Sequence, residues 1–294
     1  MPATRTNSTI VKEKQEWRLK GFAIDQPEKF ELSLELGTNH LSYAVYDGLS
    51  RFLKVVGKIE FEFLEKKDSF ALLFSELQSA TTDLFRPGYN RVYLTMNTPG
   101  ATLIPTAFYG EHLKEDYLKL NTAINVNQLV LTDEIKGGEI TVIYCIKEAI
   151  KLFLDAQFSN HKTKHISTSL LEIISSSTSR KKEKIALLNL NSSDFNLVLI
   201  DGKLRFFNTF AHASSEDILY FILFAMEQNS FDPQSDKLLI CGEIEIGSGT
   251  HKLLQQYIKN ISFALTDKNI IRSEELANIP HHYFFNLLNR LVCG

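Results

Sequence analysis

The sequence predicts an α/β protein made of two similar lobes, each with a mixed five-stranded sheet flanked by helices. The main observation is a repeated order of elements: strand, turn, strand ending in Asp-Gly, strand, helix, strand. The second copy begins about 155 residues after the first, a spacing that points to a duplicated unit. A small, polar and then charged segment, Ser175 to Glu183, separates the copies. With 44% hydrophobic residues, the chain can fill two cores.

The first copy begins with strict alternation of apolar and polar residues from Phe30 to Leu36, which predicts a strand with one apolar face. The other elements of this copy follow in order: a turn at 37–40, a strand at 41–46 closed by Asp47-Gly48, a strand at 52–63, a helix at 69–77 capped by Asp68 or Ser69, and a strand at 91–96.

The middle of the chain predicts a small inserted subdomain at 104–136, which includes an amphipathic helix from Glu111 to Leu120. A short buried strand at 140–145 and a helix at 147–158 follow. Periodicity leaves 166–174 open between strand and helix. His161 and His165 are four apart, but no third ligand lies near them in the sequence, so we expect surface histidines and no metal.

The second copy repeats the first: strands at 185–190, 195–200 and 204–210, a helix at 215–228 and a strand at 237–241. At the C-terminus, Phe284, Leu287, Leu288 and Leu291 have helical spacing. We therefore expect lobes at 1–180 and 181–294, with a helix in 281–294 that packs back on the first lobe.

Composition excludes several classes of protein. Thirty-two Lys and Arg against thirty-five Asp and Glu give a net charge of -3, so no basic surplus attracts nucleic acid. Three cysteines without short spacing do not suggest a disulfide framework or a metal knuckle. We see no signal peptide and no run of about 20 apolar residues. We therefore expect a cytoplasmic protein without direct membrane insertion.

Two short segments lie in corresponding hairpins of the two copies, and a third lies in a later loop of the second copy. They are Glu35-Leu36-Gly37-Thr38-Asn39 in the first hairpin, Asn189-Leu190-Asn191-Ser192-Ser193-Asp194 in the second, and Gly242-Glu243 in a later glycine loop. With the duplicated order of elements, they resemble the actin, Hsp70 and sugar-kinase superfamily. The nearest likeness is to actin-like proteins of type IV pilus assembly and to an uncharacterised Bacteroidetes family of unknown function. The resemblance implies a duplicated ribonuclease H-like fold.

The resemblance also implies a nucleotide cleft lined by these three segments, where glycine amides wrap the phosphates and a carboxylate positions Mg²⁺. This sequence departs from that pattern. Asn191 and Ser193 replace two glycines, Asp194 replaces a hydroxyl residue, and Glu243 replaces a third glycine. The metal-organising Asp corresponds to Glu35 in one half and to neutral Asn189 in the other. We interpret these changes as a degenerate nucleotide site.

The departures predict a non-catalytic scaffold without a cofactor, whose partner is another protein such as an envelope or secretion component. We expect no catalytic and no metal-ligating residue. The alternative is a divergent ATPase or small-molecule kinase that binds ATP and magnesium through altered contacts. A homo-oligomer is a third possibility, because actin-like lobes commonly associate.

Overall fold

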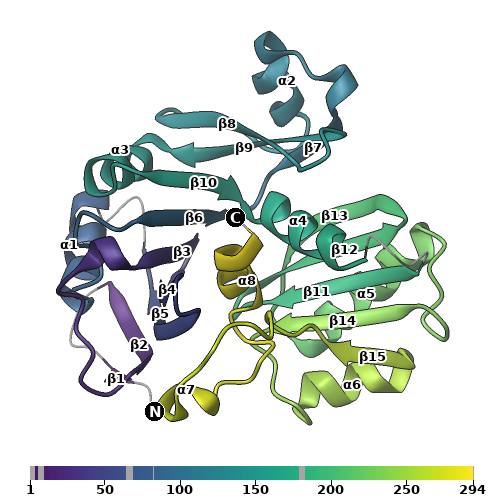
Figure 1. Cartoon of the computed structure of the whole chain (residues 1–294). Coiled ribbons are helices and arrows are strands. Elements are labelled where there is room, and N and C mark those ends of the chain that lie inside the picture. The colour runs from purple at the N-terminus through teal and green to yellow at the C-terminus, as the bar shows by residue number, and fades with distance from the viewer. Residues whose placement is uncertain (1–3, 6–9, 64–68, 82, 179–182, 294) are drawn as a thin grey trace. The chain divides into compact units, whose positions relative to one another are not determined.

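The computed structural model describes residues 4–5, 10–63, 69–81, 83–178 and 183–293 (Figure 1). Its contacts divide the chain into two compact units. The first contains Met1–Ser169, Asp267–Asn278 and Asn286–Gly294, and the second contains Leu170–Thr266 and Ile279–Phe285. The chain passes from one unit to the other inside two helices, α4 (Ile166–Thr178) and α8 (Phe285–Cys293). The C-terminal helix therefore belongs to the first unit from Asn286 onward.

The second unit contains the mixed five-stranded sheet that the sequence predicts. Its strands, in spatial order, are β13 (Lys203–Ala211), β12 (Asp194–Asp201), β11 (Lys184–Leu190), β14 (Lys237–Gly242) and β15 (Asn260–Phe263). β11, β12 and β13 are antiparallel neighbours, whereas β14 runs parallel to β11 and β15 parallel to β14. The helices α5 (Ser215–Gln228) and α6 (Gly249–Tyr257) contact each other.

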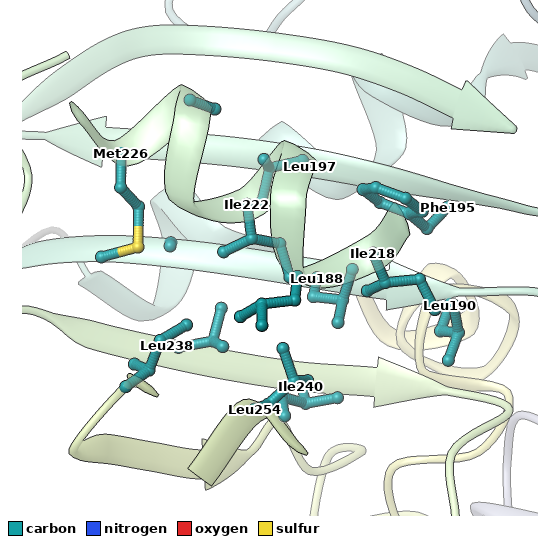
Figure 2. Close-up of a cluster of buried hydrophobic side chains, with 14 of the residues drawn as sticks. Leu188, Leu190, Phe195, Leu197, Ile218, Ile222, Met226, Leu238, Ile240 and Leu254 are labelled. Carbon is teal, nitrogen blue, oxygen red and sulfur yellow. The ribbon is translucent and has the colours of Figure 1, made fainter. Parts of the chain in front are cut away.

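The core of the second unit lies between this sheet and its two helices (Figure 2). Alternate residues of β11 and β12, such as Leu188 and Leu197, meet Ile222 and Met226 of α5. Leu254 of α6 closes the cluster next to the strand residues of β14. Burial of each such side chain contributes about 1.5–3 kcal/mol to folding. This packing fixes the edge at which the second candidate turn begins.

The first unit repeats the same order of five strands and adds two more. The shared strands are β5 (Phe52–Phe61), β4 (His40–Asp47), β3 (Glu31–Gly37), β6 (Arg91–Asn97) and β10 (His161–His165). β3, β4 and β5 are antiparallel neighbours, and β6 and β10 continue the sheet in parallel. The duplication inferred from the sequence therefore extends to the fifth strand of each sheet.

The prediction of a five-stranded sheet is wrong for the first unit, whose sheet has seven strands among the described residues. β2 (Val11–Arg18) pairs antiparallel with the outer edge of β5, and β1 (Thr4–Arg5) pairs with β2. Lys and Glu dominate β2, so the segment lacks the apolar alternation of a half-buried strand. Its pairing with an existing edge supplies the order that its side chains do not predict.

The inserted subdomain is a three-stranded antiparallel sheet, β7 (Thr102–Pro105), β9 (Ile140–Lys147) and β8 (Gln128–Glu134). α2 (Lys114–Lys119) packs on it through Leu118, preceded by a 3-10 turn, Glu111–Leu113. The sheet extends past the predicted end at 136, because β9 pairs with both β7 and β8. The buried strand expected at 140–145 therefore belongs to this small sheet.

Helix boundaries follow local signals. Ser69 caps α1 (Phe70–Ala80) by accepting a hydrogen bond from the Leu72 amide, and Ser214 forms a capping box with Asp217 at the start of α5. α3 spans Glu148–Gln157 and the short α7 spans Glu274–Ala277. Residues 166–174, for which the sequence left strand and helix open, belong to the helix α4. The predicted linker is wrong up to Thr178, which is still helical, and 179–182 lie outside the described residues.

Within the described part of the chain, no helix combines the length and the apolar character needed to span a bilayer.

Candidate functional site

The first candidate turn joins β3 to β4 through exposed Thr38 and half-buried Asn39. The backbone carbonyl of Asn39 accepts a hydrogen bond from the Phe61 amide at 2.9 Å, which ties the turn to β5. A Cβ atom on Gly37 would lie 2.2 Å from Cε1 of His40, a ring that is 1% exposed. A glycine is therefore required at position 37 because a buried imidazole occupies the space of a side chain.

Glu35 lies on β3, two residues before this turn, and is 6% exposed. Its Oε1 accepts a hydrogen bond from Asn97 Nδ2 at 3.0 Å, and its Oε2 accepts one from Asn286 Nδ2 at 2.6 Å. His40 Nε2 lies 3.8 Å from Oε1. Both carboxylate oxygens are thus bound by side chains of the first unit, one of them from α8. Glu35 links the C-terminal helix to the centre of the sheet.

Two more polar contacts hold α8 on the same sheet. Ser33 Oγ donates a hydrogen bond to the Leu287 carbonyl at 2.8 Å, and the Arg290 guanidinium lies 5.4 Å from the centre of the Tyr93 ring. Two buried oxygens near Glu35, Thr95 Oγ1 and Asn286 Oδ1, have no hydrogen-bond partner among the described residues. The cluster around Glu35 therefore retains hydrogen-bonding capacity that its own side chains do not use.

The second candidate turn, between β11 and β12, is closed by its own side chains. Asn191 Nδ2 donates to Asp194 Oδ1 at 2.7 Å, and the Asn191 amide donates to the Asp194 carbonyl at 2.9 Å. His212 Nε2 donates to the Asn191 carbonyl at 3.0 Å. Ser192 is exposed and Ser193 is half-buried. Asp194 thus stabilises the turn through its side chain, as asparagine and aspartate often do.

Asn189 is the second-half counterpart of Glu35, and it also bonds inside its sheet. Its Nδ2 donates to Asn196 Oδ1 at 2.9 Å, and Asn196 Nδ2 donates to Thr209 Oγ1 at 3.0 Å. Cys241 Sγ lies 3.4 Å from Asn189 Oδ1 as a hydrogen-bond donor. Asn189 is 4% exposed, so its amide belongs to a buried ladder that crosses β14, β11, β12 and β13.

Gly242 begins the third candidate segment with a left-handed backbone, φ +85°. A Cβ atom there would lie 2.1 Å from the Leu190 carbonyl oxygen, so only glycine fits. The Gly242 amide donates to the His282 carbonyl at 2.9 Å, and the Glu243 amide donates to the Leu190 carbonyl at 2.8 Å. Glu243 itself is exposed. Both backbone amides at the start of the loop are therefore bound to carbonyls of the second unit.

Two histidines hold the rest of this loop. His282 Nε2 donates to the Ile244 carbonyl at 2.7 Å, and the Gly247 amide donates to His251 Nδ1 at 3.1 Å. Burial lowers the pKa of His282, which favours the neutral ring. The sequence does not predict this role for either histidine, because each is bonded to a backbone atom of the loop, and His282 is 38 residues from its acceptor.

The structure contradicts the expectation that His165 lies at the surface, since it is fully buried in β10. Its Nε2 donates to the Thr98 carbonyl at 2.9 Å, whereas its Nδ1 accepts from the Ser167 amide at 3.2 Å. Alternation on β10 places His161 and His165 on one face of a strand, and His161 instead contacts Asp155. In the described ranges, no group of three His, Cys, Asp or Glu residues gathers in a way that could hold a metal ion.

Asp133 is a second buried group that the sequence did not reveal. It accepts hydrogen bonds from the His165 amide at 2.7 Å, from Thr168 Oγ1 at 2.8 Å and from the Tyr144 hydroxyl at 3.2 Å. Burial raises the pKa of Asp133 despite these bonds. The network joins β8 and β9 of the inserted subdomain to β10 and α4. We assign it a structural role.

Burial lowers the pKa of His165 to about 4, which makes the stability of the protein depend on pH. An unfolded histidine has a pKa near 6.5, so between these values the unfolded chain binds more protons. We expect His165 to contribute a loss of about 3 kcal/mol as the pH falls from 7 to 4. Asp133 acts in the opposite direction, because its raised pKa favours the folded state at low pH.

Urea unfolding of the wild type and of His165→Gln at several pH values tests this expectation. Asp133 is present in both proteins, so the difference between the two pH profiles isolates the histidine. The wild-type curve should fall more steeply than the variant curve below pH 6.5. Parallel curves would show that His165 titrates normally and that its burial has no cost.

The strand order within each of the two sheets, with a hairpin turn in each unit, is that of an actin-like fold. A protein from Bacteroides thetaiotaomicron VPI-5482 with an actin-like ATPase fold and unknown function matches 93% of this chain and 100% of its own, with a TM-score of 0.74 at 20% identity. The structure of a PilM–PilN type IV pilus biogenesis complex matches 90% of this chain and 98% of that chain, with a TM-score of 0.59 at 12% identity. Both similarities establish the fold.

A model of the protein family of unknown function DUF3822 matches residues 19–261. The chain belongs to this family. None of the functionally curated proteins is significantly similar to it. The predicted fold class, a duplicated actin-like α/β fold, is confirmed. The predicted cleft residues stay a prediction.

Proposed function

We propose that the protein is a non-catalytic actin-like scaffold that binds another protein, and that its nucleotide cleft is degenerate. The observation that carries this proposal is the environment of Glu35. The carboxylate that would organise Mg²⁺ in a nucleotide-binding relative accepts hydrogen bonds from Asn97 and Asn286 through its two oxygens. A magnesium ion or its water ligands would have to compete with both amides.

The second turn supports the same proposal. Its amide hydrogen bonds close the turn on itself, and Asp194 brings a negative charge to the position of a phosphate-binding hydroxyl. At about 4 Å and an effective dielectric constant near 20, each repulsion between unit charges costs on the order of 4 kcal/mol. Glu243 adds a second exposed carboxylate. The polar side chains of this turn bond to each other, and its negative charge repels a triphosphate.

Binding to another protein is a function for which this fold has a precedent. The PilM–PilN complex includes a protein with this fold bound to another protein. We propose a comparable partner here, such as an envelope or secretion component. Self-association is also compatible with an actin-like scaffold. We also propose that the protein acts in the cytoplasm.

Calorimetric titration of the full chain with Mg-ATP tests the proposal. We expect no heat of binding up to millimolar ATP. Binding with a micromolar Kd would contradict the scaffold function as stated, because that affinity corresponds to about 8 kcal/mol of favourable free energy.

A gain-of-binding variant tests the cause of the missing affinity. Asn191→Gly, Ser193→Gly, Asp194→Thr and Glu243→Gly together remove two carboxylates and free the backbone of two turns. We expect this variant to bind Mg-ATP measurably, since removal of one repulsion of about 4 kcal/mol corresponds to roughly a thousandfold in affinity. Asp201→Asn, which removes a carboxylate at the opposite end of β12, is the control. A folded variant with no affinity would contradict the preserved cleft geometry.

The second candidate function is a divergent Mg-ATP-binding ATPase or small-molecule kinase. The buried oxygens of Thr95 and Asn286 favour it, because unused acceptors beside a carboxylate suit a hydrated cation. The same titration separates the two functions. If wild-type protein binds Mg-ATP and Glu35→Gln weakens the binding, the enzyme is favoured over the scaffold.

A further inference from the structure

The second unit has an open sheet edge at β13. Among the described residues, β13 pairs only with β12, so one side of its backbone has no strand neighbour. The corresponding edge strand of the first unit, β5, is covered by β2 in an antiparallel register from Val11 opposite Phe61 to Arg18 opposite Val55. The duplicated fold therefore accepts an added antiparallel strand at this edge, and the second unit leaves the position open (Figure 1).

A chain of aromatic rings runs from this edge onto the surface of α5. Phe206 and Phe210 of β13 have ring centres 6.2 Å apart, and Phe210 stacks on Phe221 at 4.5 Å. Tyr220 contacts Phe221 at 5.3 Å and stacks on Phe224 at 6.1 Å. Tyr220 is 62% exposed and Phe224 is 50% exposed. We call these five residues the aromatic patch. Exposed aromatic residues next to an open edge are typical of an interface.

We propose that β13 pairs antiparallel with β13 of a second copy of this chain, about a two-fold axis near Phe207, to form a homodimer. The two sheets then become one continuous sheet, and the aromatic patches of both copies cover each other. This inference deepens the proposed scaffold function, because it names one partner of the scaffold as the protein itself. A two-fold contact uses the same surface on both copies and therefore closes at two.

Charge is the reason to prefer a second copy over an unrelated strand. About a two-fold axis at Phe207, Lys203 of one copy lies opposite Ala211 of the other, and Arg205 lies opposite Thr209, so the pairing places no like charges directly opposite each other. Antiparallel pairing places Lys203 at the start of one strand beside the end of the other strand, from which the chain leads directly to exposed Glu216 in the first turn of α5. Each copy thus offers a cation and an anion in complementary places.

Sedimentation equilibrium of the full chain from about 1 to about 100 μM tests the proposal, in the micromolar range expected for an interface of modest size. We expect a reversible monomer–dimer equilibrium. Phe224→Glu should weaken dimerisation at least about 30-fold, since it places a charge in the covered patch. Tyr257→Glu, at a residue of α6 that is 48% exposed, is the matched control and should leave dimerisation unchanged.

A charge exchange gives a second, milder test. Lys203→Glu and Glu216→Lys should each weaken the dimer about fivefold, and the double variant should recover most of that loss. A wild-type protein that stays monomeric to 100 μM, or a dimer that neither Phe224→Glu nor the charge reversals affect, would overturn the proposal. Neither result bears on Mg-ATP binding, so the failure of this dimer is distinguishable from the failure of the scaffold function.

Discussion

Replacement of Gly242 by alanine is expected to destabilise the protein by about 2–5 kcal/mol. The backbone at this residue has φ +85°, which costs an alanine about 1–2 kcal/mol. The added Cβ would also lie 2.1 Å from the Leu190 carbonyl oxygen, so β11 and the loop must separate. Overpacking of this kind costs a further 1–3 kcal/mol, roughly. The midpoint of urea unfolding measures the effect.

Gly247→Ala in the same loop is the control. Gly247 also has a positive φ, +79°, but a Cβ atom there would meet nothing within 4 Å. We expect only the conformational cost, about 1–2 kcal/mol. If both variants lose the same free energy of unfolding, the contact with Leu190 does not contribute to the cost of the Gly242→Ala substitution. In that case the glycine of this loop would be better explained by a ligand than by packing.

The second large effect is expected for Glu35→Ala, which should destabilise the first unit by about 2–6 kcal/mol. The substitution leaves the amide donors of Asn97 and Asn286 buried without an acceptor, and each orphaned donor costs about 1–3 kcal/mol. Glu31→Ala on the same strand is the matched control. Burial raises the pKa of Glu31, so loss of that carboxylate should have little cost near pH 7.

A double-mutant cycle separates the contribution of α8 from that of the sheet. Glu35→Ala and Asn286→Ala should together cost less than the sum of the two single variants, because either one breaks the 2.6 Å hydrogen bond. Additive losses would show that Glu35 does not anchor the C-terminal helix. A Glu35→Ala variant as stable as wild type would indicate that the carboxylate serves a ligand.

The strands that face a packed core could be predicted from sequence, and those that do not were missed. Phe30 to Leu36 and Ile185 to Leu190 show apolar patterns because helices cover their sheets. β2 and β10 are rich in Lys, Glu and His, and each forms because an existing strand offers an edge. Periodicity records burial of side chains and carries no signal for such edge pairing.

Contacts between distant segments limited the prediction of the site. The sequence identified Glu35 and Asp194 as candidate site residues, and the hydrogen bond between Asn191 and Asp194 is a local one that is typical of turn residues. One partner of Glu35, Asn97, is 62 residues away and the other, Asn286 on α8, is 251 residues away, and the partner of the Gly242 amide is His282. None of these pairings has a local signature. His165 was misplaced for a related reason, since its acceptor is a backbone carbonyl 67 residues away.

We propose that the polar turns of this fold stabilise the protein and do not bind a nucleotide. Equilibrium unfolding of the full chain with and without about 5 mM Mg-ATP, at matched ionic strength, tests it most directly. A ligand present at 100 times its Kd stabilises the folded state by about 2.7 kcal/mol. We predict no change in the unfolding free energy. Stabilisation by more than about 2 kcal/mol with Mg-ATP, absent with magnesium alone, would contradict the claim.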